Sequence, residues 1–206
     1  MPLLRTLLLS LVLLWPAAAL ANARVLVLGD SLSAAYGLPA EQGWVGLLAA
    51  ALKAEGSAWE VVNASVSGET SSGGAARIGD ALARHQPAVV VIALGANDGL
   101  RGLGPDLLAA NLRRMAVAAT QSGARVLLIG IRIPPNYGPA YTRAFEGTFS
   151  KVAAELQLPL LPFLLEPIAA EESWFQPDRL HPTAEAQPLI LAHVRTALDP
   201  LLKDTP

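Results

Sequence analysis

Short, uninterrupted apolar runs alternate along the chain with longer segments whose apolar residues recur at helical spacing. The apolar runs predict strands at 25–28, 61–62, 89–94, 126–131 and 158–163. The helical spacing predicts helices at 44–54, 71–85, 105–122, 140–156 and 184–198. Proline at 105 and glycine at 123 punctuate the third of these helices at its start and end.

Continuous apolar strands, unlike strands with alternating polarity, indicate a sheet that is covered on both faces. Strand–helix alternation then favours parallel strands joined by right-handed crossovers. We therefore expect an α/β protein, a three-layer α/β/α sandwich with about five parallel strands in the flavodoxin-like order 2-1-3-4-5. The proline-interrupted fifth run suits a sheet edge. No repeat or linker divides residues 22–206, which predicts a single domain.

Residues 1–21 have the pattern of a cleaved secretory signal peptide. Arg5 supplies positive charge, 7–15 form a short apolar segment, and Ala19-Leu20-Ala21 forms a small-x-small cleavage site. An alternative site, Ala21-Asn22-Ala23, lies two residues further on. The other interpretation is an uncleaved anchor helix, but the apolar segment is shorter than the about 20 residues that span a membrane. The expected location is periplasmic or secreted.

Composition excludes several classes of function. The 206 residues carry a formal charge of −2, which provides no basic field for nucleic acid. With no cysteine there is no disulfide, zinc–thiolate site, iron–sulfur cluster or cysteine nucleophile. No His/Asp/Glu cluster has metal-ligand spacing and no phosphate-binding glycine motif occurs, so we expect neither metal nor cofactor. Nothing in the sequence indicates an oligomer.

Polar residues follow the predicted strands at the carboxyl edge of the sheet, where open α/β proteins place their sites. These loops are 29–33, 63–70 and 95–99, together with 178–182 late in the chain. They hold a hydroxyl, backbone amides, a carboxamide, a carboxylate and an imidazole. That set is the complement for acyl transfer: a nucleophile, oxyanion donors, a base and a group that orients the base.

Four ordered blocks in these loops resemble the SGNH (GDSL) hydrolase family: Gly29-Asp30-Ser31-Leu32, Gly68, Gly95-x-Asn97-Asp98 and Asp178-x-x-His181. Residues 95–102 and 131–138 are similar to loops of its bacterial periplasmic thioesterase, lysophospholipase and arylesterase group. One departure is Ala96, where that group usually has glycine.

The resemblance implies that Ser31 is the nucleophile, His181 the general base and Asp178 the residue that orients the imidazole. It implies an oxyanion hole formed by Ser31, Gly68 and Asn97. Each residue also has a purely structural interpretation. Ser31 could cap a helix, Gly68 could serve a turn with positive φ, and Asn97 and Asp178 could stabilise turns.

The resemblance also implies a small-molecule acyl ester or thioester as substrate, with transient contact to membrane lipid. Apolar side chains that could contact the acyl chain are Leu100, Leu103, Pro134, Tyr137 and Leu180. Ordinary packing is the alternative for each of them. Two other functions remain open: an esterase acting on acylated carbohydrate, and an exported binding module without catalysis.

Overall fold

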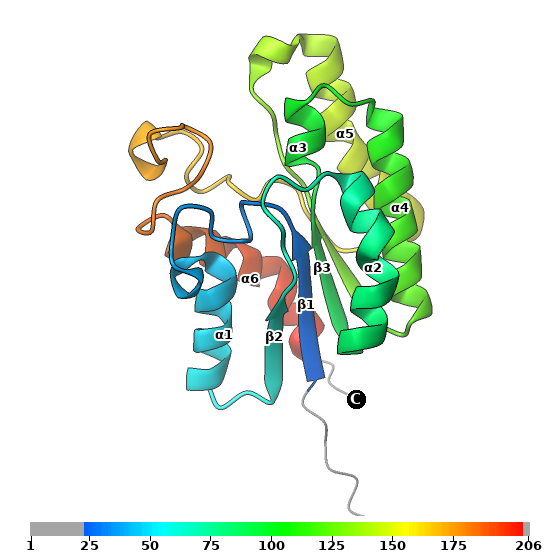
Figure 1. Cartoon of the computed structure of the whole chain (residues 1–206), viewed down its shortest axis with the longest axis vertical. Helices are drawn as coiled ribbons and strands as arrows, with labels where there is room; N and C mark the ends of the chain where they lie inside the picture. Colours follow the sequence, from blue (N-terminus) through cyan, green and yellow to red (C-terminus); the bar gives the residue numbers. More distant parts are fainter. Residues whose placement is uncertain (1–22, 204–206) are drawn as a thin grey trace, which may run out of the picture.

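A five-stranded parallel sheet forms the centre of the computed structural model, which describes residues 23–203 (Figure 1). Its order is β2-β1-β3-β4-β5, so the predicted flavodoxin-like topology is confirmed. The strands are β1 (Ala23–Gly29), β2 (Trp59–Asn63), β3 (Val89–Ala93), β4 (Arg125–Ile129) and β5 (Leu160–Leu161).

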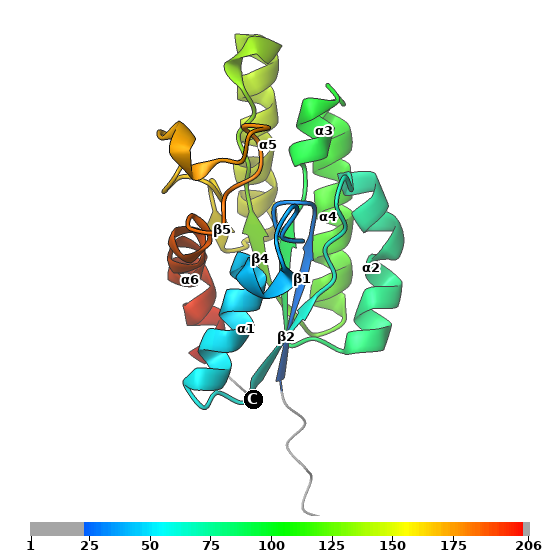
Figure 2. The same cartoon turned by 60° about the vertical axis from the view of Figure 1, so that its left-hand side comes forward.

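Helices cover both faces of the sheet, as Figures 1 and 2 show, and produce the predicted three layers. On one face α1 (Trp44–Ala54) packs against α6 (Gln187–Lys203). On the other, α4 (Pro105–Gln121) lies between α2 (Ser71–His85) and α5 (Pro139–Leu156). The short elements are α3 (Ala96–Leu100) and three 3₁₀ turns, η1 (Ala40–Gln42), η2 (Pro135–Tyr137) and η3 (Glu172–Trp174).

The core is built on the central strands, because helices on both sides remove their side chains from water. Every residue from Val25 to Leu28 and from Val89 to Ile92 is completely buried. Burial of one such side chain stabilises the fold by about 1.5–3 kcal/mol relative to exposure. This explains why these runs contain no polar residue. Strands with one face exposed to solvent would instead alternate between apolar and polar residues.

Several predicted boundaries are wrong, and the reasons are physical. The last helix begins at Gln187 rather than 184, and it continues to Lys203. The fifth strand is only two residues long, because the prolines at 159 and 162 have no N–H to contribute to a ladder. Helix α3 was expected to be loop, since five residues are too few to show helical periodicity.

The predicted signal peptide lies outside the described residues. Within residues 23–203, no helix combines the length and apolarity needed to cross a bilayer.

Pairing between β1 and β3 determines where the chain leaves the sheet. The last pair of that ladder joins Gly29 to Ala93, so both strands end at the same level. A Cβ on Gly29 would lie 2.7 Å from the Cβ of Ser33 and 2.9 Å from the Oγ of Ser65. Only glycine therefore lets the chain turn this tightly after β1 and keep the loop that follows β2 beside it.

We expect Leu112→Ala to lower the free energy of unfolding by about 2–5 kcal/mol, because its completely buried side chain on α4 would leave a cavity. The matched control is Leu107→Ala on the same helix, where the side chain is 46% exposed. That variant should change stability by less than about 0.5 kcal/mol. Urea titration measures both; equal losses would contradict the packing described above.

Candidate active site

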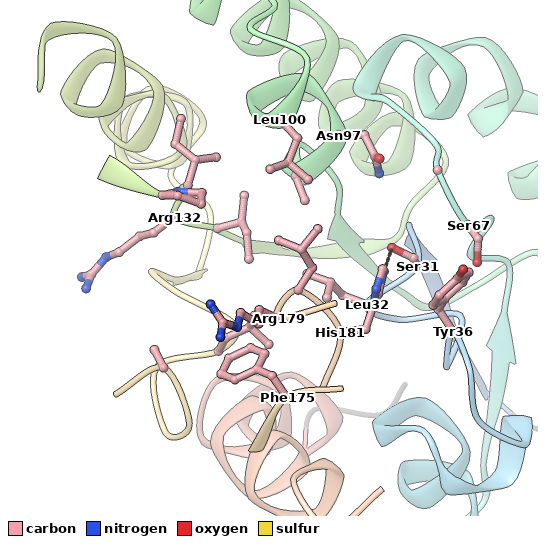
Figure 3. A pocket seen from close by; sticks show the side chains of 18 of the residues that line it. Ser31, Leu32, Tyr36, Ser67, Asn97, Leu100, Arg132, Phe175, Arg179 and His181 are labelled. Carbon is pink, nitrogen blue, oxygen red and sulfur yellow. Dashed lines mark hydrogen bonds between the residues drawn. The ribbon is translucent and has the colours of Figure 1, made fainter. Parts of the chain in front are cut away.

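Ser31, His181 and Asp178 form a continuous chain of hydrogen bonds at the carboxyl edge of the sheet. Ser31 lies in the turn after β1, and its Oγ is 2.8 Å from Nε2 of His181, the contact dashed in Figure 3. The other ring nitrogen, Nδ1, lies 2.7 Å from Oδ2 of Asp178. With Nδ1–H donated to the carboxylate, Nε2 is left to accept the proton of the serine hydroxyl.

The loop that carries Asp178 and His181 is organised by the carboxylate itself. Asp178 Oδ1 accepts the backbone N–H groups of Leu180 at 2.9 Å and of His181 at 3.0 Å. Partial burial alone would raise the pKa of Asp178. These backbone donors and the imidazole outweigh burial and lower the pKa from its ordinary 3.8 to about 2. The carboxylate is therefore ionised at neutral pH and can hold the imidazole in one tautomer.

The backbone N–H groups of Ser31 and Gly68 are available to an external acceptor. Neither has a protein acceptor among the described residues. Gly68 has φ +79°, so the turn interpretation of this glycine also holds. The Asn97 amide donates one N–H to the carbonyl of Glu69 at 3.0 Å, which leaves its second N–H for a ligand. Figure 3 shows the Asn97 amide nitrogen on the side of Ser31.

A buried carboxylate ties together the loops that carry Gly68 and Asn97. Asp98 is 0% exposed; its oxygens accept the backbone N–H of Ser71 at 2.7 Å and the Ser71 hydroxyl at 2.5 Å. Asn111 donates to the same hydroxyl at 2.9 Å. Asp98, on α3, thus accepts hydrogen bonds from the first residue of α2 and holds the two helices together.

A cavity of about 470 Å³ opens beside Ser31. Of the apolar residues expected to contact substrate, Leu100, Pro134 and Leu180 line it. Leu103 and Tyr137 are not among its lining residues, so their contact with substrate stays a prediction. The Tyr137 hydroxyl donates to the carbonyl of Leu100, and the backbone carbonyl of Leu103 accepts from the hydroxyl of Tyr141.

Other cavity residues were missed by the sequence analysis. Ile131 and Ile133 follow β4 at the carboxyl edge, so the edge rule could have found them. Tyr36 also lines the cavity, and its ring centroid lies 4.3 Å from that of His181. Its carbonyl accepts a hydrogen bond from Gln176 at 2.9 Å, a contact across 140 positions that no local pattern signals.

No metal site accompanies these groups in residues 23–203, where His, Asp and Glu side chains form no cluster of three able to hold an ion. The arrangement contains a hydroxyl with a base, three donors for an oxyanion, and an apolar cavity. Such an arrangement is suited to acyl transfer.

Family comparison agrees with this geometry. The chain belongs to the GDSL-like Lipase/Acylhydrolase family, whose model matches residues 27–188, and it is an enzyme of the esterase and thioesterase class. The resemblance seen in the four sequence blocks is thereby confirmed.

Several named enzymes are similar to this chain in sequence and structure. The esterase TesA of Pseudomonas aeruginosa is 50% identical, over 94% of this chain and 96% of that protein. The thioesterase 1/protease 1/lysophospholipase L1 of Escherichia coli is 43% identical, over 94% and 91%. The crystal structure of the psychrotrophic esterase EstA from Pseudoalteromonas, inhibited by monoethylphosphonate, has a TM-score of 0.85 and 40% identity. The alignment covers 89% of this chain and all of that one.

The buried carboxyl of Asp30, next to Ser31 in the chain, lowers the stability of the fold near neutral pH. It is 1% exposed, and its Oδ1 accepts the N–H of Leu32 at 3.0 Å. Burial raises the pKa of Asp30 from its ordinary 3.8 to about 7; the Leu32 donor opposes this rise, and the charges of Asp98 and Glu69 add to it. The folded protein therefore keeps this proton up to a higher pH than the unfolded chain does.

We expect this carboxyl to destabilise the fold progressively between about pH 4 and pH 7. The contribution of the protonated carboxyl to the free energy of unfolding is fully present below the unfolded pKa of 3.8. It is lost as the pH rises through the folded pKa of about 7. Asp30→Asn removes the titration, so the variant should gain up to roughly 4 kcal/mol relative to wild type across this window. Urea unfolding at several pH values measures the difference; parallel profiles for the two proteins would refute it.

Proposed function

We propose that the protein is a serine esterase that hydrolyses carboxylic esters and thioesters of fatty acyl groups through an acyl-enzyme on Ser31. The observation that carries the proposal is the hydrogen-bonded chain Ser31–His181–Asp178 at the wall of an apolar cavity. The GDSL-like Lipase/Acylhydrolase family and the esterase names of the relatives support it.

The geometry suggests a two-stage reaction. Nε2 of His181 removes the proton of Ser31 as Oγ attacks the acyl carbonyl carbon, and Asp178 stabilises the imidazolium that forms. The carbonyl oxygen becomes an oxyanion that accepts hydrogen bonds from the N–H groups of Ser31 and Gly68 and from the Asn97 amide. The intermediate collapses, the alcohol or thiol leaves with the proton from Nε2, and the acyl group stays on Oγ.

Water completes the cycle by the same route. His181 removes a proton from the attacking water, the second tetrahedral oxyanion forms in the same hole, and its collapse returns the proton to Ser31. The carboxylic acid is released. No step requires a cofactor, because each bond change is matched by a proton transfer through one imidazole.

The lining of the cavity favours acyl chains over acylated carbohydrate. The apolar part of the lining includes Leu32, Leu100, Ile131, Phe163 and Phe175. A sugar would leave its hydroxyls against these side chains without partners, which costs free energy, whereas an alkyl chain would be stabilised there.

The proposed site lies in one domain, residues 22–206, that follows a cleaved signal peptide at 1–21. Export to the periplasm or beyond would place the enzyme among envelope lipids and away from cytosolic acyl-CoA. Lysophospholipids and other envelope esters are accordingly the substrates we favour, met through transient contact with lipid.

We expect Ser31→Ala to abolish hydrolysis of a p-nitrophenyl ester series from acetyl to palmitoyl and to abolish labelling by a fluorophosphonate probe. The reason is that, within residues 23–203, the Ser31 hydroxyl is the group that contacts Nε2 of His181. Ser150→Ala, on the exposed side of α5, is the matched control and should keep both properties. Equal turnover by wild type and Ser31→Ala would show that Ser31 is not the nucleophile. Turnover of the acetyl ester alone would favour the carbohydrate esterase.

We expect Asp178→Asn to reduce kcat by about 10²- to 10⁴-fold with little change in KM, because an amide can no longer select the productive tautomer of His181. Asp80→Asn, at an exposed position of α2, should retain wild-type kcat. Steady-state kinetics on one ester, with melting temperature as a folding check, separates the two. A fall of less than about fivefold in Asp178→Asn would argue against its orienting role.

A further inference from the structure

Two arginine side chains, Arg132 and Arg179, border the largely apolar cavity. Figure 3 shows both on the side opposite Ser67 and Tyr36, beyond His181 as seen from those residues. Neither takes part in the acyl-transfer steps described above. Their charge at the wall of an acyl cavity therefore calls for another explanation.

Arg132 is held in place but has no ionic partner. Its neighbours Ile131 and Ile133 are 8% and 6% exposed, so the backbone on both sides is anchored in the core. The guanidinium carbon lies 4.9 Å from the ring centroid of Phe163, which itself lines the cavity. Among residues 23–203 no carboxylate forms an ion pair with Arg132. Its positive charge is thus free to act on a ligand.

Arg179 occupies a backbone conformation that does not suit it. Its φ is +58°, in the left-handed region where glycine or asparagine is far more easily accommodated. Strain of this kind, located between Asp178 and His181, commonly accompanies a functional role for the side chain.

The one ion pair of Arg179 does not account for that strain. Its Nε lies 2.5 Å from Oε1 of Glu172, but the two side chains are 77% and 66% exposed. Ion pairs this exposed contribute little to stability. A guanidinium has five N–H donors, so an anionic ligand can share Arg179 with Glu172.

We propose that Arg132 and Arg179 form an anion subsite that selects acyl substrates carrying a carboxylate or phosphate away from the scissile carbonyl. The subsite rests on the proposed esterase function and names its substrate class. Guanidinium groups bind both anions through paired N–H donors. The anion could belong to the acyl chain or to the alcohol, and the two sources can be distinguished.

The test compares matched substrates that differ only in charge. For the acyl side, p-nitrophenyl adipate, with its free carboxylate, is compared with its methyl ester. For the alcohol side, 1-acylglycerol 3-phosphate is compared with 1-acylglycerol. The quantity measured is the ratio of kcat/KM for the anionic substrate to kcat/KM for the neutral one, in wild type and in the double variant Arg132→Gln/Arg179→Gln.

We expect a wild-type ratio of about ten or more in at least one pair, falling toward one in the double variant. The variant Arg132→Lys/Arg179→Lys keeps both charges and should retain most of the preference. Arg143→Gln, an exposed position of α5 outside the cavity lining, should keep the wild-type ratio. A preference in only the adipate pair assigns the anion to the acyl chain, and one in only the glycerol pair assigns it to the alcohol.

The outcomes separate this proposal from the one on which it depends. If wild type hydrolyses the neutral esters but shows the same ratio as the double variant in both pairs, the anion subsite is refuted and the esterase function stands. If wild type and Ser31→Ala are equally inert on every ester, the esterase function itself fails, and the subsite fails with it.

Discussion

The parallel pairing of β1 with β3 is the constraint on which the site depends. Because Gly29 and Ala93 close that ladder together, the segment carrying Ser31 and the segment carrying Asn97 leave the sheet at one level and one edge. The pairing survives because both strands are buried on both faces, where a backbone group without a partner would be costly. Core stability and the assembly of the active site therefore come from the same interaction.

Two buried carboxylates next to the catalytic loops have opposite effects on the fold. Asp98 is satisfied by both donors of Ser71, and in return it locks α3 to the start of α2. Asp30 has one backbone donor and a pKa raised by burial, so its ionised form is disfavoured in the folded protein. The first carboxylate holds in place the helix that carries Asn97, one of the oxyanion donors we propose, whereas the second lowers the stability of the fold near neutral pH.

The loop between 176 and 182 is held by hydrogen bonds to Asp178 and contains one residue with a strained backbone conformation. Asp178 fixes its own loop through two backbone donors while it holds the imidazole, so one carboxylate does both tasks. Arg179 sits in a left-handed conformation within that same turn. In our interpretation the turn serves two purposes, orientation of His181 and presentation of a positive charge to the cavity.

The fold class could be predicted from the sequence, because continuous apolar runs indicate strands buried on both faces and because the proline and glycine that bound α4 are local signals. The edge rule indicated the loops, and the resemblance of four sequence blocks to the SGNH hydrolase family singled out Ser31, Gly68, Asn97, Asp178 and His181 within them. Which apolar residues line the cavity follows from the tertiary structure: Leu100, Pro134 and Leu180 line it, Leu103 and Tyr137 do not, and Tyr36 lies against His181. Those contacts join positions far apart in the chain, and side-chain packing between distant segments leaves no periodic signal in the sequence.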